Sequence, residues 1–194
     1  MYISELPEKA PSRGNWFSQS LGRLILRLGG WEYKGEWPDV PQCAIIIAPH
    51  TSNWDFIVGL SAAFACRLSP RWLGKDALFK SALGWFFHWQ GGLPVERNHP
   101  HGMVGSVVDT VKKTPKIWLV LAPEGTRSKV KKWRTGFYHI AHNAGIPIVP
   151  VAFDWKNKKI HVLELYYPTG DFEKELPEIQ ALFNFAEGYD NKNA

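Results

Sequence analysis

Unbroken apolar runs and apolar residues at helical spacing predict the secondary structure of the chain. The run from Cys43 to Ala48 is continuously apolar and rich in β-branched residues, which is typical of a strand covered on both faces. Further strands are predicted at residues 71–75, 91–96, 116–122, 146–154 and 160–166. Segments with apolar residues at helical spacing predict helices at residues 16–28, 56–68, 76–89, 102–113, 136–144 and 171–185.

Strands that alternate with helices are typical of the α/β class, in which helices cover both faces of a largely parallel sheet. We therefore expect a single, doubly wound, mostly parallel sheet flanked by helices. Residues 31–37 fit either a short strand or a turn. Pro147 and Pro150 predict an irregular segment within the strand at 146–154, because proline cannot donate to a strand ladder.

The length of 194 residues suits one hydrophobic core, so we expect a single domain over residues 1–194. Its first 30 residues or so are predicted to be a loosely held arm, 1–15, followed by an amphipathic helix at 16–28. One face of this helix carries Phe17, Leu21, Leu24 and Leu28, whereas Arg23 and Arg27 lie elsewhere on the cylinder. This pattern fits both a helix lying in a membrane interface and a helix packed on the core.

Composition adds two expectations about surface and partners. The chain contains ten Trp and eleven Phe, more aromatic residues than a core of this size needs, so we expect some of them outside the core. The formal net charge is +5, which favours an anionic partner such as a membrane surface, an acidic carrier protein or a phosphate-bearing substrate. No nucleic-acid-binding motif accompanies the charge.

No apolar run reaches the roughly 18 residues that a membrane-spanning helix needs, and residues 1–13 lack a signal-peptide pattern. Cys43 and Cys66 fall inside an apolar strand and an apolar helix, as expected of reduced core thiols in a cytoplasmic protein. We therefore expect a cytoplasmic protein that is peripherally associated with the inner face of a membrane.

The strand ending at Ala48 leads directly into a chemically rich loop. Pro49 stops the ladder, and Ser52 and Asp55 have the spacing of a capping box, which predicts that Ser52 lies at the N-cap of the next helix. With Asp55 in the first turn, its carboxylate is directed back toward His50. The pair can then act as a general base with an orienting carboxylate. The alternative is that Asp55 only completes the cap.

Two later segments also place an arginine after a strand-like approach: residues 91–98 read GGLPVERN, and residues 121–128 read LAPEGTRS. Together with H-x4-D at His50 to Asp55 and I-P-I-V-P-V at 146–151, their order and spacing resemble the glycerophosphate and lysophospholipid acyltransferase family, the PlsC-like enzymes. The resemblance covers about residues 41–153.

This resemblance implies an acyltransferase that moves a fatty acyl group from acyl-CoA or acyl carrier protein to a hydroxyl of a glycerophosphate or lysophospholipid, without a cofactor. It assigns His50 as the catalytic base and Asp55 as its partner. It assigns binding of the acceptor to Arg97, Glu124, Gly125, Thr126 and Arg127. Pro94 stands where many members have an aromatic residue, so the identity of the acceptor stays open.

Other residues at predicted strand ends fit the same site. Lys75 ends the strand at 71–75, where its ammonium group suits a phosphate or is simply solvated. Arg127 can hold a phosphate with two parallel hydrogen bonds. Glu124 could hold an acceptor hydroxyl, orient Arg127 or form a surface ion pair with it. The basic run at 129–134 could receive coenzyme A phosphates, an acidic carrier protein or lipid headgroups.

Three other functions compete with acyl transfer. A thioesterase or other hydrolase would need an activated serine, and the G-x-S-x-G motif is absent. The histidine pairs at 99/101 and 139/142 lack an evident third ligand, so no metal is expected. A peripheral lipid-binding module would have no use for His50 beside Asp55.

Overall fold

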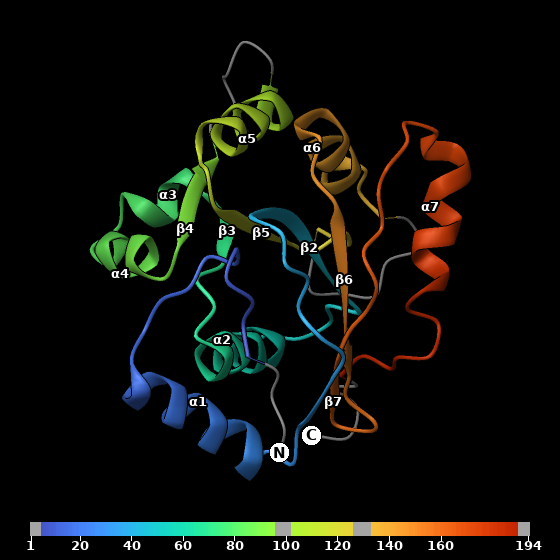
Figure 1. The fold of residues 1–194 in the computed structure, drawn as a ribbon. Helices are drawn as coiled ribbons and strands as arrows, with labels where there is room; N and C mark the ends of the chain where they lie inside the picture. The colour runs from blue at the N-terminus through green and yellow to red at the C-terminus, as the bar shows by residue number, and fades with distance from the viewer. Residues whose placement is uncertain (1–4, 96–101, 126–132, 190–194) are drawn as a thin grey trace.

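The computed structural model describes residues 5–95, 102–125 and 133–189, which form a seven-stranded sheet between two layers of helices (Figure 1). The strand order is β1-β7-β6-β2-β5-β3-β4. The strands are β1 (Glu32–Lys34), β2 (Gln42–Ala48), β3 (Arg71–Lys75), β4 (Gly92–Val95), β5 (Ile117–Leu121), β6 (Ile148–Asp154) and β7 (Lys159–Val162). The helices are α1 (Trp16–Leu28), α2 (Trp54–Cys66), α3 (Asp76–Phe79), α4 (Gly84–Trp89), α5 (Gly102–Lys113), α6 (Gly136–Ala144) and α7 (Phe172–Ala181).

The predicted fold class is confirmed. Strands β6, β2, β5, β3 and β4 run parallel, while β7 pairs antiparallel with β6 and carries β1 at the sheet edge. Side chains of β2 alternate between the two faces: Cys43 and Ile45 join the core under α1 and α2, and Ala44 and Ile46 join the core under α5, α6 and α7. Burial on both faces explains the unbroken apolar run.

The prediction of one helix over residues 76–89 is wrong. The structure has two short helices there, α3 and α4, which are separated by a turn. The hydroxyl of Ser81 donates to the carbonyl of Leu78, and Gly84 then brings the chain back against Phe79. A Cβ at Gly84 would lie 2.0 Å from the Phe79 carbonyl oxygen, so the return depends on glycine. Apolar spacing alone does not reveal this close approach.

Strand β6 is regular, which corrects the prediction of an irregular segment at Pro147 and Pro150. All seven of its residues are buried. Pro150 pairs with Ile46 of β2 and lies one residue before the antiparallel ladder with β7, which begins at Val151. The N–H that proline lacks is therefore not needed in that ladder.

The segment before α1 is held more firmly than a loose arm. Ala10 is buried, Ser12 forms a β-bridge with Leu68, and the backbone N–H of Arg13 donates to the Arg67 carbonyl. Residues 11–13 therefore pack along the loop that follows α2.

Helix α1 has the predicted bounds and packs on α2 through a narrow stripe. Gly22 and Leu26 are its buried residues, and a Cβ at Gly22 would lie 2.5 Å from the Ser61 carbonyl oxygen of α2. The predicted apolar face of α1 points elsewhere: Phe17 is 63% exposed and Leu28 is 79% exposed. The core-packing interpretation of that face is therefore wrong.

Candidate active site

The loop after β2 brings His50 and Asp55 into contact. Ala48 is the last residue of β2, the Ala48–Pro49 peptide bond is cis, and α2 begins at Trp54. His50 Nδ1 lies 3.1 Å from Asp55 Oδ2, and the Asp55 side chain is only 1% exposed. Because Nδ1 faces the carboxylate, the other ring nitrogen, Nε2, takes no part in this contact.

Several N–H groups converge on the buried Asp55 carboxylate. The backbone N–H groups of Thr51 and Ser52 each donate to Oδ2 at 2.9 Å, and the indole Nε1–H of Trp155 donates to Oδ1 at 2.6 Å. These bonds compensate for removing a charged group from water. The carboxylate is thus held in place by the loop that carries His50 and by the chain after β6.

The predicted capping box is only half formed. Asp55 accepts from the Ser52 N–H as expected, but the Ser52 hydroxyl accepts from the N–H of Trp54, and Asn53 occupies the N-cap position. Helix α2 consequently starts two residues before the predicted Phe56. Asp55 therefore serves both the helix start and the contact with His50.

Glu124, just beyond the end of β5, reaches the same loop. It is buried, and its Oε2 accepts a hydrogen bond from the backbone N–H of His50 at 3.2 Å. Burial raises the pKa of the Glu124 carboxyl above its ordinary value, and the nearby charge of Asp55 adds to this, while the bond from His50 opposes it. Its burial contradicts the interpretation of Glu124 as part of a surface ion pair.

Of the other predicted binding residues, the structure describes Gly125 and the backbone of Lys75. Gly125 follows Glu124 with a left-handed φ of +63°, and the Arg134 side chain packs where a Cβ would stand. Lys75 ends β3, where its backbone pairs with Val95 of β4. The predicted roles of Arg97, Thr126 and Arg127, and most of the basic run at 129–134, fall outside the described residues.

Two parts of the site were not predicted. Trp155 lies 100 residues after Asp55, and no motif marks its contact. The segment near the end of the described chain also touches the loop: the Thr51 hydroxyl donates to the Tyr189 carbonyl, and a Cβ at Gly188 would lie 2.8 Å from that hydroxyl oxygen. The sequence shows that Trp155 and Gly188 are present, but no pattern in it indicates what they contact.

An apolar groove of about 330 Å³ opens beside α2, between α1 and the turn after β6. Its walls include Ile25, Leu26, Ile57, Val58, Trp155 and Tyr189. The Lys158 ammonium group lies 4.5 Å from the centre of the Trp155 ring and 5.4 Å from that of Trp31. The groove therefore combines apolar walls with one cation near the residue that contacts Asp55.

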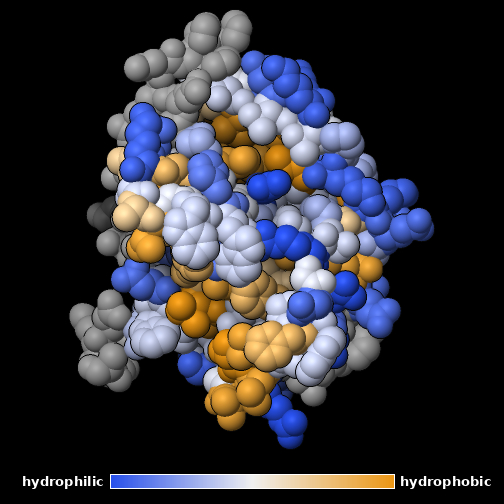
Figure 2. All heavy atoms as spheres, turned by 90° about the vertical axis from the view of Figure 1, so that its left-hand side faces the viewer, coloured by the Kyte–Doolittle hydropathy of each residue, from blue (hydrophilic) through white to orange (hydrophobic). Residues whose placement is uncertain are grey.

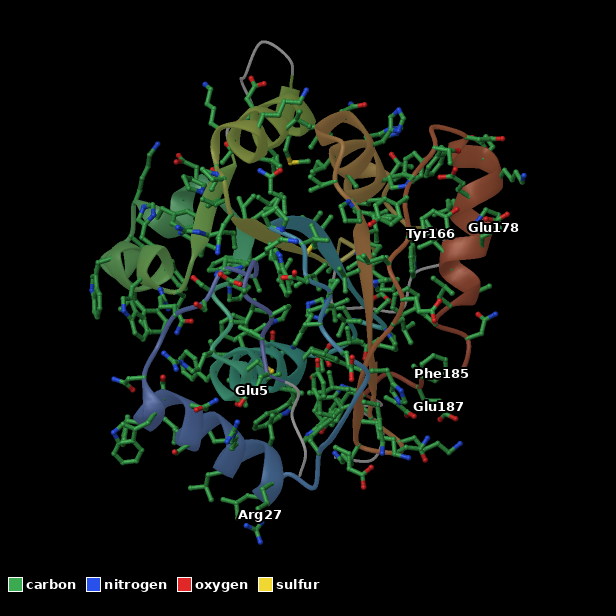
Figure 3. The ribbon with its side chains drawn as sticks, viewed as in Figure 1. Glu5, Arg27, Tyr166, Glu178, Phe185 and Glu187 are labelled. Carbon is green, nitrogen blue, oxygen red and sulfur yellow. The ribbon has the colours of Figure 1, made fainter. Side chains whose placement is uncertain are left out.

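Large hydrophobic side chains are exposed on the side of the molecule that carries α1 and α4. Figure 2 shows the molecule from this side. Hydrophobic side chains gather over the lower part of this view, where α1 lies. We call the exposed apolar residues of α1 and α2 the apolar face: Trp16, Phe17, Leu21, Leu24, Ile25, Leu28, Trp54, Phe56 and Ile57. Arg27 points outward from the same helix (Figure 3). None of the described helices has both the length and the apolarity to cross a bilayer.

The cysteines and two of the histidines have structural surroundings. Cys43 and Cys66 are buried free thiols; burial raises the pKa of Cys66 to about 11 and that of Cys43 well above its ordinary value. Neither thiol therefore supplies a thiolate nucleophile at neutral pH. His139 and His142 pack on aromatic rings of Tyr138 and Phe172 on the α6 side.

Comparison with known proteins finds similarity over most of the chain. The family described as Acyltransferase matches residues 36–154. The 1-acyl-sn-glycerol-3-phosphate acyltransferase of Escherichia coli K12 is 32% identical over 130 residues, which are 63% of this chain and 51% of that protein. The protein of the same name from Limnanthes douglasii is 25% identical over 71% of this chain and 50% of its own length.

The chain therefore spans about half the length of the curated relatives it matches. Among solved structures, the 1-acyl-sn-glycerophosphate acyltransferase PlsC from Thermotoga maritima superposes with a TM-score of 0.63. That match covers 87% of this chain and 76% of the other at 16% identity, and it supports a shared fold.

Proposed function

The chain belongs to the acyltransferase family, and from this we propose that it transfers a fatty acyl group from a thioester to the hydroxyl of a glycerophosphate or lysophospholipid. The donor is acyl-CoA or acyl carrier protein. Relatives named 1-acyl-sn-glycerol-3-phosphate acyltransferase favour an acceptor that carries a phosphate. The formal net charge of +5 suits both the phosphate and the anionic donor.

The contact between His50 Nδ1 and Asp55 Oδ2, at 3.1 Å, carries this proposal. In the reaction, His50 Nε2 removes the proton from the acceptor hydroxyl as that oxygen attacks the thioester carbonyl carbon. The tetrahedral intermediate then collapses, the carbon–sulfur bond breaks, and the imidazolium returns the proton to the leaving thiolate. An ester and a free thiol are formed, and no covalent enzyme intermediate is needed.

Asp55 contributes by holding the imidazole and by stabilising the imidazolium that forms during attack. Glu124 contributes by holding the backbone N–H of His50, whereas Asp55 holds its ring. Two fixed points on one histidine restrict both its ring and its main chain. This restriction reduces the entropy that is lost when the acceptor hydroxyl is aligned with the base.

We also propose that the protein works at a membrane surface, with the apolar face of α1 and α2 in the interface. An exposed row of Phe, Leu and Trp side chains beside the outward Arg27 is the composition of an interfacial helix. The groove of about 330 Å³ opens next to this face and offers apolar volume for an acyl chain. Both features suit a substrate drawn from lipid.

Release of free thiol tests the proposal directly. The assay uses acyl-CoA or acyl carrier protein as donor, and glycerol-3-phosphate, lysophosphatidic acid and other lysophospholipids as acceptors. Thiol release that requires an acceptor, together with the matching ester product, supports the transferase. Release that is indifferent to the acceptor indicates a thioesterase. Vesicle binding without thiol release from either donor indicates a lipid-binding module.

A further inference from the structure

Trp155 is the first residue after β6, and its indole reaches the carboxylate of Asp55. The bond from Nε1 to Oδ1 is 2.6 Å long. The contacts from His50, Thr51 and Ser52 all fall on the other oxygen, Oδ2. Within the described residues, Trp155 is therefore the donor that holds Oδ1.

The indole of Trp155 is itself fixed from several directions. Its ring lies edge to face against Trp31, with centroids 4.8 Å apart, and against Tyr189, with centroids 4.7 Å apart. Its backbone N–H donates to the Glu187 carbonyl, and the Lys158 ammonium group covers the ring. Contacts from separate parts of the chain thus determine where Nε1 points.

An indole N–H has two properties that suit this position. It is a donor only, so it cannot compete with Asp55 for the proton of the imidazole. It is also uncharged, so it stabilises the carboxylate without neutralising the charge that His50 requires during proton transfer. A bond to Oδ1 fixes the plane of the carboxyl group, and this fixes the direction in which Oδ2 faces Nδ1.

We propose that Trp155 is a positioning residue for catalysis, which acts on the reaction through Asp55 by holding its Oδ1. This inference rests on the proposed function. It predicts that removing the indole N–H lowers kcat while the KM values of donor and acceptor stay nearly constant. A merely structural tryptophan would affect the unfolding temperature but leave kcat of the folded protein unchanged, and a wall of the acyl groove would affect the KM of the donor.

The test replaces Trp155 with Phe and, separately, with 3-benzothienylalanine, an isostere that has sulfur in place of the indole N–H. Hydrogen bonds to charged groups are strong enough that we expect kcat to fall about 10- to 100-fold in both variants. The isostere keeps the ring and its packing, so its unfolding temperature should fall less than that of Trp155→Phe, by the loss of the one bond to the buried carboxylate. The control is Trp37→Phe, which removes the indole donor to Cys66 Sγ near the opposite end of α2. It should leave kcat unchanged.

A double-mutant comparison tests whether Trp155 acts through Asp55. In an Asp55→Asn background, Trp155→Phe should change the residual kcat by less than about twofold, because neighbouring residues that act together are not additive. The inference is overturned if the isostere variant keeps the kcat of wild type. It is also overturned if Trp155→Phe lowers kcat in the Asp55→Asn background as much as it does in the wild-type protein. Absence of acceptor-dependent transfer by the unmodified protein instead overturns the proposed function.

Discussion

Glu124 Oε2 accepts the backbone N–H of His50 across 74 residues of sequence, and this bond ties the end of β5 to the loop after β2. Both segments leave neighbouring parallel strands at the same edge of the sheet, since β2 pairs with β5. In open α/β sheets, ligands bind outside the carboxyl ends of the strands. The ends of β2 and β5 that carry these residues therefore meet at the edge where such sheets bind ligands.

Glu124→Gln should change how stability depends on pH. Burial raises the pKa of Glu124 above its ordinary value of 4.5, so the folded protein binds this proton more tightly than the unfolded chain does. Stability from this group is therefore present below about pH 4.5 and is lost as the pH rises through the higher folded pKa. Glutamine stays neutral, and its amide oxygen can still accept the bond from His50. The variant should gain stability relative to wild type as the pH rises through this window.

Thermal unfolding at a series of pH values measures this difference. Glu164→Gln is the matched control, because Glu164 is exposed and its replacement should leave the pH dependence unchanged. A constant difference in unfolding temperature between wild type and Glu124→Gln across the acidic range would show that Glu124 ionises as easily as in water.

His50→Ala should lower kcat about 10²- to 10⁴-fold, because general-base catalysis typically contributes that much to the rate. The side chain is partly exposed and lies at the start of the loop after β2, so the unfolding temperature should change little. His142→Ala is the control: this exposed histidine lies in the last turn of α6, which leads to the amino end of β6. Acceptor-dependent thiol release measures both variants. Equal activity of wild type and His50→Ala would rule out His50 as the base.

Much of the fold could be predicted because burial on both faces leaves an unbroken apolar signature, as in β2, and because exposed helices keep their period, as in α1 and α5. The capping-box spacing also placed His50 in the loop and Asp55 in the first turn of the helix that follows it. Long-range contacts left no such trace: neither the bond of Glu124 to His50 nor that of Trp155 to Asp55 has a local pattern.

The apolar face of α1 shows that the sequence predicts an amphipathic helix without predicting what the helix packs against. Its period identifies an amphipathic helix but does not say what covers the apolar side. In the structure, α1 packs through Gly22 and Leu26, and Phe17 and Leu28 stay exposed. A small residue four positions before a leucine is a weaker signal than a row of large apolar residues, although it marks the face that packs on α2.

Gly22→Ala should destabilise the protein by about 1–3 kcal/mol, the usual range for overpacking a close contact. The new Cβ would meet the Ser61 carbonyl oxygen and the Ala65 nitrogen at 2.5 and 2.6 Å, and these backbone atoms cannot move without shifting α1 away from α2. Gly136→Ala is the control, because no atom lies within 4 Å of its Cβ position and alanine favours helix. Urea unfolding should give a lower midpoint for Gly22→Ala and an unchanged or higher midpoint for Gly136→Ala. Equal midpoints in wild type and Gly22→Ala would show that α1 does not pack closely on α2.

The double variant Phe17→Ser/Leu28→Ser should weaken binding to vesicles of phosphatidylethanolamine and phosphatidylglycerol. Full burial of each such side chain is worth about 1.5–3 kcal/mol, and partial burial in an interface still gives a loss of about 10- to 100-fold in affinity. Because both side chains are exposed, the fold and the activity toward a soluble acceptor should be retained. Vesicle co-sedimentation measures the affinity.

The matched control is Phe185→Ser/Leu182→Ser, which removes the same two residue types from the side of the molecule that carries α7. Both side chains are exposed, and Phe185 lies far from α1 (Figure 3). Binding through the apolar face predicts that this control sediments with vesicles as wild type does. It also predicts that the apolar contribution persists at high salt, whereas attraction between Arg23, Arg27 and anionic lipid is screened. An equal loss of binding in the two double variants would mean that general surface hydrophobicity, rather than α1, holds the protein at the vesicle.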